Sequence, residues 1–183
     1  MRSYLKFAHR SWAQLLRPYD TAIDATCGNG NDTLKLAQLL PQGQVIAIDI
    51  QKEAIERARQ LTSGYNVNFY HQSHAEFPNE AYLKPIRLIV YNLGYLPGGD
   101  KSQITKTEET LRSFEKALEL IAPGGIITIT CYPGHPGWQA EKEAILRRAS
   151  TLSPNNWRAT AHSWSFKATA PSLLMVKKRN HLF

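Results

Sequence analysis

A glycine-containing segment near the start of the chain has the residue types that bind a small ligand through the main chain. In DATCGNGND, residues 24–32, Gly28 and Gly30 allow a tight turn and a close approach of the backbone to a ligand. A dinucleotide-binding GxGxxG motif would place its third glycine at position 33, where this chain has Thr33. That substitution disfavours close binding of a pyrophosphate, so the segment predicts a cofactor loop of another kind.

Two carboxylates accompany this loop and narrow the choice of cofactor. Asp24 stands four residues before Gly28, as is typical of the first motif of methyltransferases. There the acid orients the glycine loop or receives the methionine ammonium of S-adenosylmethionine, directly or through water. Asp49 lies 21 residues after Gly28, where an acid accepts hydrogen bonds from both ribose hydroxyls of an adenosyl group. NAD enzymes share this pair, and Asp49 has a structural alternative as a helix N-cap before Gln51.

A third predicted cofactor contact follows the next apolar segment. In the HQSHA sequence, residues 71–75, Ser73 and His74 offer backbone and side-chain contacts to an adenine ring and its exocyclic amine. Taken alone, His74 is equally explained as a loop cap. In register with the glycine loop and Asp49, however, the pair favours an adenosyl ligand, and the three elements together indicate S-adenosylmethionine.

The NLGYLPGGD segment, residues 92–100, contains the predicted methyl-acceptor site. An asparagine, a small residue and then an aromatic residue resemble the NPPY-type motif of amino-group methyltransferases. In that motif the amide and a following carbonyl hold the target nitrogen while the ring stacks on the base. Asn92 and Tyr95 are the candidates for these roles, because a sulfonium is already a strong electrophile and positioning is most of the catalysis. The alternative is a glycine-rich turn in which Tyr95 only packs.

An alkylamine acceptor also needs a group that takes or shares its proton, because such an amine is mostly protonated near neutral pH. Asp100, Tyr132 and His135 are candidates, in no fixed order. His135 has three open roles, as a base, a substrate hydrogen-bonding group or a loop cap. Cys27 and Cys131 have no metal-ligand spacing, so we expect no metal site.

Strand and helix patterns alternate along the chain and must bring these residues to one edge of a sheet. The alternation predicts an α/β fold, a Rossmann-like class I methyltransferase with a mostly parallel, doubly wound seven-stranded sheet and an antiparallel C-terminal strand. A capping box of Thr105 and Glu108 is expected to begin one helix, and Pro123-Gly124-Gly125 to end it. The predicted strands are 21–26, 44–50, 66–70, 86–91, 126–131, 157–165 and 171–178, and the predicted helices are 31–40, 51–62, 105–121 and 138–151.

The length of 183 residues suits one domain, 1–183, and the net charge of +7 favours a polyanionic partner. Residues 1–17 predict an amphipathic helix packed on that domain. Its apolar side carries Leu5, Ala8, Trp12, Leu15 and Leu16. Arg2, Lys6 and Arg10 recur every four residues on the other side, and with Lys101 they are candidate RNA contacts; a merely solvated face is the alternative.

Five segments together resemble a specific family of small methyltransferases long described as rRNA methylases. They are DATCGNGNDT, AIDIQ, the Ser73–His74 pair, NLGYLPGGDK and YPGHPG, and the resemblance runs from Phe7 to about Glu141. It implies methylation of the aminomethyl nitrogen of 5-aminomethyl-2-thiouridine at the tRNA wobble position, in the anticodon stem-loop. It also implies cofactor contacts at Asn29, Asn31, Asp32, Asp49, Gln51, Ser73 and His74, and we add Asn92 to that set.

Other functions remain open on the sequence alone. They are methylation of another RNA base or of a small-molecule amine, a dinucleotide oxidoreductase, and a non-catalytic RNA-binding module. The absence of a long apolar run predicts no membrane span, and the reduced cysteines favour the cytoplasm. A homodimer is left open.

Overall fold

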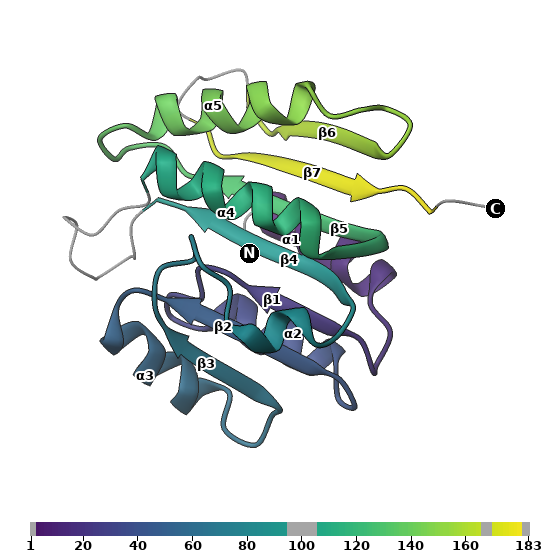
Figure 1. The fold of residues 1–183 in the computed structure, drawn as a ribbon. Helices are drawn as coiled ribbons and strands as arrows, with labels where there is room; N and C mark the ends of the chain where they lie inside the picture. The colour runs from purple at the N-terminus through teal and green to yellow at the C-terminus, as the bar shows by residue number, and fades with distance from the viewer. Residues whose placement is uncertain (1–2, 95–105, 166–169, 181–183) are drawn as a thin grey trace.

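The computed structural model describes residues 3–94, 106–165 and 170–180. Within these ranges seven strands form one sheet in the order β3-β2-β1-β4-β5-β7-β6 (Figure 1). The predicted seven-stranded, mostly parallel sheet is therefore confirmed. The strands are β1 Thr21–Asp24, β2 Gln44–Asp49, β3 Val67–His71, β4 Ile86–Leu93, β5 Ile121–Cys131, β6 Trp157–Ser163 and β7 Ser172–Lys178.

Strand direction decides which loops meet. β1 to β5 are mutually parallel, whereas β7 is antiparallel to both of its neighbours, β5 and β6. β6 consequently runs the same way as β5, and the last residues of β1, β2, β4, β5 and β6 share one edge. In an open parallel sheet this carboxyl edge is where ligands bind.

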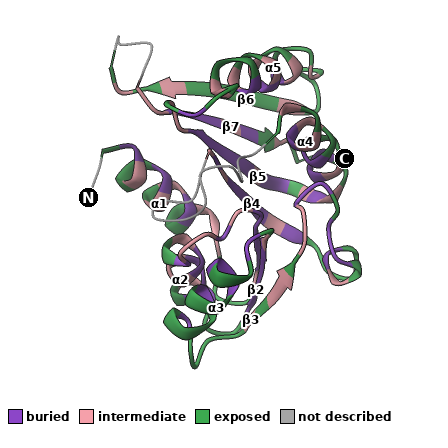
Figure 2. Ribbon diagram, turned by 90° about the vertical axis from the view of Figure 1, so that its left-hand side faces the viewer, coloured by how far each residue is buried: buried purple, intermediate pink, exposed green. Residues whose placement is uncertain are grey.

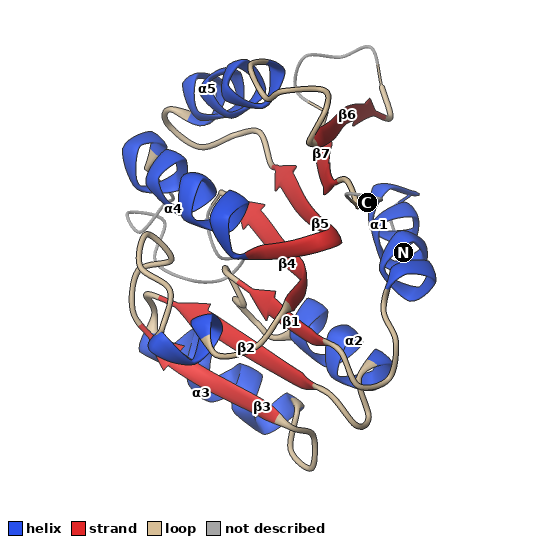
Figure 3. Cartoon of the chain, turned by 45° about the vertical axis from the view of Figure 1, so that its right-hand side comes forward, coloured by secondary structure: helices blue, strands red, loops and turns tan. Residues whose placement is uncertain are grey.

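Helices cover both faces of the sheet (Figure 3). The first three helices pack on one face, and the last two pack on the other. The helices are α1 Ser3–Leu15, α2 Asn31–Leu39, α3 Lys52–Leu61, α4 Thr107–Leu120 and α5 Trp138–Ser150, with a short 3-10 helix η1 at Asn79–Tyr82. As the residue spacing predicts, α1 buries Ala8 and Trp12 and leaves Lys6 and Arg10 exposed.

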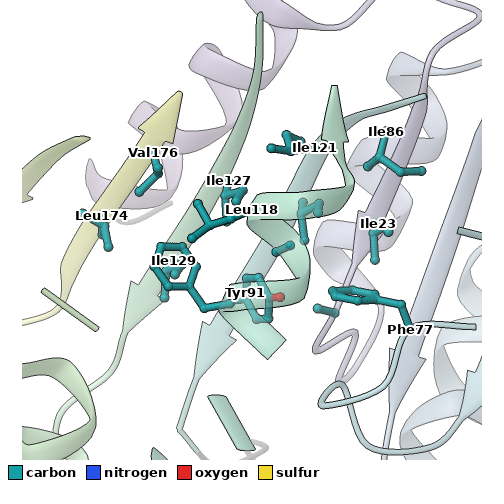
Figure 4. Close-up of a cluster of buried hydrophobic side chains, with 14 of the residues drawn as sticks. Ile23, Phe77, Ile86, Tyr91, Leu118, Ile121, Ile127, Ile129, Leu174 and Val176 are labelled. Atoms are coloured by element: carbon teal, nitrogen blue, oxygen red, sulfur yellow. The ribbon is translucent and has the colours of Figure 1, made fainter. Parts of the chain in front are cut away.

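The core lies in the middle of the sheet, between the two helical layers (Figure 2). Under α4, Leu118 lies against Ile127 and Ile129 of β5, with Tyr91 of β4 beside them (Figure 4), and Phe114 belongs to the same buried cluster. Alternate residues of the same strands point to the other face and pack on α1 and α2. Both faces of the central strands are apolar because both are covered.

The sequence prediction for the segment around α4 and β5 needs correction. α4 begins at Thr107 with Lys106, not Thr105, at the N-cap position, and the Lys106 side chain makes no capping hydrogen bond; Thr105 of the predicted capping box lies outside the described residues. β5 already begins at Ile121 and includes the Pro-Gly-Gly sequence that was expected to separate helix from strand. The pairing with β4 shifts there, and Arg87 Nη1 donates to the Pro123 carbonyl at 2.8 Å. Gly124, with φ of 75°, allows this irregular stretch to remain paired within the sheet.

Candidate active site

The glycine loop between β1 and α2 is shaped by two left-handed glycines. Gly28 has φ of 51° and Gly30 has φ of 81°, a backbone region that residues with a Cβ rarely adopt. A Cβ on Gly30 would lie 2.7 Å from the Ala58 Cα, so the start of α2 packs directly on the backbone of α3. The loop is therefore held close to the sheet edge, where its amides can approach a ligand.

Asp24 anchors this loop from beneath. The side chain is completely buried, and its Oδ2 accepts a hydrogen bond of 2.7 Å from the Thr33 hydroxyl in the first turn of α2. Burial raises the pKa of Asp24 to about 7, and the nearby Asp32 carboxylate adds to the rise. Of the two roles predicted for Asp24, this geometry supports orienting the loop. Thr33 stands where a dinucleotide motif has glycine because it supplies this hydroxyl.

Asp49 ends β2 with its carboxylate tied to two backbone amides. Oδ2 accepts from the Gly28 N–H at 2.8 Å, and Oδ1 accepts from the Gln51 N–H at 2.9 Å. Burial raises the pKa of Asp49, and these amides oppose the rise. Gln51 itself is the N-cap residue of α3, so the alternative of Asp49 as the N-cap is wrong. A carboxylate has roughly four acceptor positions, which leaves room for a hydrogen bond from a ribose hydroxyl.

Asp32 connects three elements at the centre of the edge. Its Oδ1 accepts from His9 Nε2 on α1 at 2.7 Å, and its Oδ2 accepts from Asn92 Nδ2 at the end of β4 at 2.9 Å. The His9 and Asp32 side chains are only 15% and 13% exposed. The backbone N–H of Asn92 also donates to the Thr26 hydroxyl at 2.7 Å. The orientation of Asn92 is thus set from two sides.

His9 is a site residue that the pattern of the sequence did not single out. A lone histidine on an amphipathic helix carries no signal of its own, and its partner Asp32 is 23 residues away. Only the family resemblance, which begins at Phe7-Ala8-His9, reaches this part of the chain. The His9–Asp32–Asn92 connection arises because α1 packs beside α2.

The predicted adenine contacts lie after β3, and their side chains have partners elsewhere. Ser73 Oγ donates to Glu109 Oε2 on α4 at 2.9 Å. The His74 ring is buried edge-on against Tyr91, with 5.8 Å between ring centroids. The backbone carbonyl of His74 accepts a hydrogen bond from the Ser113 hydroxyl. Burial lowers the pKa of His74 to about 4, so the imidazole is neutral at pH 7, although Glu109 acts in the other direction. The adenine contact stays a prediction.

The loop after β5 packs against the end of β4. His135 is buried, its Nδ1 contacts the Pro136 carbonyl at 3.0 Å, and its Nε2 is 4.0 Å from Glu141 Oε2 on α5. Glu141 is also buried and accepts a hydrogen bond of 2.6 Å from the Thr110 hydroxyl. Sequence reasoning missed Glu141, because its tertiary surroundings alone distinguish it from other acids of an amphipathic helix.

Four predicted site residues lie outside the described residues, namely Arg2, Tyr95, Asp100 and Lys101. The other predicted cofactor and acceptor residues lie at the carboxyl edge, on loops, at strand ends or, for Asn31 and Asp32, in the first turn of α2. Within the described ranges no group of three or more His, Cys, Asp or Glu residues is arranged to hold a metal ion, and both cysteines are free and buried. None of the described helices is long and apolar enough to cross a membrane.

A sheet of this order, with an antiparallel β7, a glycine loop after β1 and an acid at the end of β2, defines a class I S-adenosylmethionine-dependent methyltransferase. The donor set fits that cofactor, because amides and a tethered carboxylate line one edge. Within the class, the chain belongs to the family described as "Putative rRNA methylase", whose model matches residues 45–178.

Individual relatives agree with this membership. The chloroplastic tRNA (mnm(5)s(2)U34)-methyltransferase of Arabidopsis thaliana is 36% identical, over 95% of this chain and 69% of that protein. A Clostridium thermocellum structure described in the same words as the family is 32% identical, with a TM-score of 0.88 over 97% of this chain and 98% of that one. A Streptococcus mutans methyltransferase solved with SAH is 33% identical, with a TM-score of 0.86 over 97% and 99% of the two chains.

Proposed function

We propose that this protein transfers a methyl group from S-adenosylmethionine to the aminomethyl nitrogen of 5-aminomethyl-2-thiouridine at the tRNA wobble position. The product is 5-methylaminomethyl-2-thiouridine. The observation that carries the proposal is the 36% identity to a tRNA (mnm(5)s(2)U34)-methyltransferase along 95% of the chain. That span includes both the cofactor loop and the acceptor end of β4, so the likeness is not confined to the cofactor half.

The cofactor would be held mainly by the β1–β2 side of the edge. Asp49 would accept the ribose hydroxyls, since the Gly28 and Gln51 amides already fix its carboxylate. The glycine loop, with Asn29 and Asn31, would face the methionine end, and the segment at Ser73 and His74 the adenine. Bound S-adenosylmethionine supplies an electrophilic methyl group, so the protein has to position the acceptor rather than activate the donor.

The acceptor amine would lie near Asn92. A primary alkylammonium has no lone pair, and it must lose a proton before the nitrogen can accept a methyl group. The side-chain carbonyl of Asn92 would accept a hydrogen bond from the amine. The Asp32 carboxylate, which accepts from the Asn92 side-chain N–H, places negative charge beside that amine. His9 holds the other Asp32 oxygen and thereby keeps that carboxylate ordered. Asp32 therefore joins Asp100, Tyr132 and His135 as a candidate for the proton.

The RNA backbone would follow the exposed side of α1. A groove of about 440 Å³ between α1 and α2 is lined by seven residues, among them His9, Arg10, Asn31 and Lys35. Two cations at a groove that reaches the glycine loop suit phosphates of a nucleic acid. This supports the predicted contact at Arg10 and adds Lys35 to the candidates, whereas Lys6 does not line the groove and stays a prediction.

Alternatives within the same chemistry are other RNA substrates and free amines. The family description names rRNA, which keeps a ribosomal substrate as the second candidate. The single domain over 1–183 and the cytoplasmic location are part of the same proposal and stand on the sequence reasoning given above, and a homodimer is left open.

Mass spectrometry of nucleosides tests the function directly. The protein is incubated with isotope-labelled S-adenosylmethionine and tRNA that carries 5-aminomethyl-2-thiouridine, in parallel with rRNA and with the free nucleoside. We expect the label in 5-methylaminomethyl-2-thiouridine from tRNA. Label in an rRNA base, or in the free nucleoside but not in tRNA, would replace the proposed substrate.

A further inference from the structure

A cluster of aromatic rings joins α1 to the end of β6, outside the site described above. Phe7 lies 4.8 Å from His162 and 5.7 Å from Trp164, measured between ring centroids, and His162 lies 6.2 Å from Trp164. Tyr4, one turn before Phe7, contacts Trp164 on one side and Tyr132 of the acceptor loop on the other, at 6.1 and 5.9 Å. The cluster is therefore continuous with the predicted acceptor site.

The direction of β6 explains why the cluster lies near the active site. β6 runs parallel to β5, so its last residues reach the carboxyl edge. His162 pairs with Leu173 of β7, and Leu173 pairs with Thr130 of β5. His162 is thus level with the last residues of β5, immediately before Tyr132. Figure 2 shows α1 and the end of β6 on the same side of the molecule as these strand ends.

The rings do not form a closed core. Tyr4 is 6% exposed, but Phe7 is 38% exposed and His162 and Trp164 are half-buried. Burying an aromatic ring is favourable, and Tyr4, Ala8 and Trp12 of α1 are buried in this way. Phe7 instead presents part of its ring to solvent beside two other rings, which together form a ring surface of Phe7, His162 and Trp164.

The described elements that carry the ring surface bear only positive charges. On α1, Lys6 precedes Phe7 and Arg10 lies one turn further on, and the charged residue of β6, Arg158, is exposed near the start of that strand. Neither α1 nor β6 contains an Asp or Glu residue. Exposed rings bordered by cations are the combination with which proteins bind unpaired nucleic acid, because rings stack on bases and cations neutralise phosphates.

We propose that the ring surface of Phe7, His162 and Trp164 stacks an unpaired base of the RNA loop that carries the target nucleoside. This proposal rests on the proposed function. A base next to the target nucleoside would lie between α1 and the end of β6, and the RNA phosphates would follow the basic side of α1. A loop base held there fixes the RNA relative to Tyr132 and the acceptor end of β4. A helical stem has no free base to offer, so the surface selects a single-stranded loop.

Direct RNA binding tests the proposal independently of methyl transfer. Fluorescence anisotropy with a labelled anticodon stem-loop is measured for wild type, Phe7→Ala, Phe7→Trp and the control Tyr82→Ala. Tyr82 is 54% exposed on η1, just before β4 begins and so at the opposite edge of the sheet. Base–aromatic stacking predicts roughly 5- to 150-fold weaker binding for Phe7→Ala. Phe7→Trp should bind at least as tightly as wild type, and Tyr82→Ala should be unchanged.

A second ligand, the same stem closed into a duplex without a loop, separates stacking from general RNA affinity. Its binding should be equal for wild type and Phe7→Ala, and S-adenosylmethionine affinity by calorimetry should also be equal. Phe7→Ala binding the loop RNA within two-fold of wild type, equal weakening on duplex and loop, or no RNA binding by the wild type would each overturn the proposal. Loop binding with this dependence but without methyl transfer would support the ring surface and reject the proposed function.

Discussion

The two halves of the carboxyl edge are built differently. On the cofactor side, β1 and β2 position a contiguous loop, and the contacts that shape it involve backbone amides, as between Asp49 and Gly28. On the acceptor side, side chains from separate elements meet, as do His9, Asp32 and Asn92. The cofactor side can therefore be predicted from a sequence motif. The predicted acceptor side depends on how the helices pack.

The largest expected effect is on the free energy of unfolding, through the buried Asp24 on the cofactor side. The pKa of Asp24 in the folded protein is raised to about 7, above its ordinary value of 3.8. A raised acid pKa means that the folded state holds its proton more tightly than the unfolded chain does, so the contribution of Asp24 to stability is greatest at low pH and falls as pH rises from about 4 to about 7. For one buried group this is on the order of several kcal/mol. Asp49 and His74, whose pKa values are also shifted, are the same in wild type and Asp24→Asn, so urea unfolding across that range should show a steeper fall in wild type than in the variant. The same pH dependence of stability in both proteins would show that Asp24 does not bind the extra proton of the folded state.

The next effect should fall on turnover at the acceptor side. Asn92→Ala removes the side-chain amide that donates to Asp32 and keeps the backbone N–H that donates to Thr26, and misplacing the acceptor costs about 10²-fold in kcat. Cofactor affinity should change only a few-fold if the two halves are separable. Single-turnover assays and calorimetry on the same variant decide this. A loss of S-adenosylmethionine binding as large as the loss of kcat would break the comparison.

Asp49→Ala is the matching change on the cofactor side. It removes a carboxylate that we expect to accept two ribose hydroxyls, and such a loss costs about 1–3 kcal/mol, roughly 5- to 150-fold in affinity. Calorimetry with S-adenosylmethionine measures it, with circular dichroism to show that the variant is folded. A folded Asp49→Ala that binds the cofactor as tightly as wild type would remove the ribose role.

His9→Ala should have a smaller effect, because His9 acts through Asp32. One charge-assisted hydrogen bond is worth about 1.5–3 kcal/mol at most, and a partly exposed one less, so we expect about a five- to tenfold lower kcat. The KM for S-adenosylmethionine should be unchanged, and the pH profile of kcat should shift. Gln14→Ala, at an exposed position of α1, is the control. Equal profiles for both variants would reduce His9 to a packing residue.

The smallest effect concerns the basic side of α1. Each phosphate contact made by Lys or Arg adds roughly 0.7–0.9 to the slope of log binding constant against log salt. Replacing Lys6 and Arg10 by Gln should therefore weaken tRNA binding and flatten its salt dependence by up to two contacts. Cofactor affinity should stay constant. An unchanged slope would move the RNA footprint away from α1, to Arg147, Arg148 and the 177–179 run.

The alternation of apolar strands and amphipathic helices was sufficient to determine the sheet, because periodicity reports burial on one or two faces. The sequence also predicted the glycine loop, Asp24 and Asp49, because their spacing along the chain matches expected ligand contacts at consecutive strand ends. The segment 105–125 was less predictable, since Pro and Gly usually end helices, whereas here β5 begins before them and tolerates an irregular pairing with β4.

Only the tertiary structure decided which side chains meet at the predicted acceptor side. Nothing in the sequence distinguishes His9 from other helical histidines, or Glu141 from other acids of α5, until packing places them against Asp32 and His135. The same holds for Phe7 and Trp164, which are more than 150 residues apart and meet because β6 returns parallel to β5. Local patterns specify elements, but a contact between distant elements depends on strand order, which the sequence does not display locally.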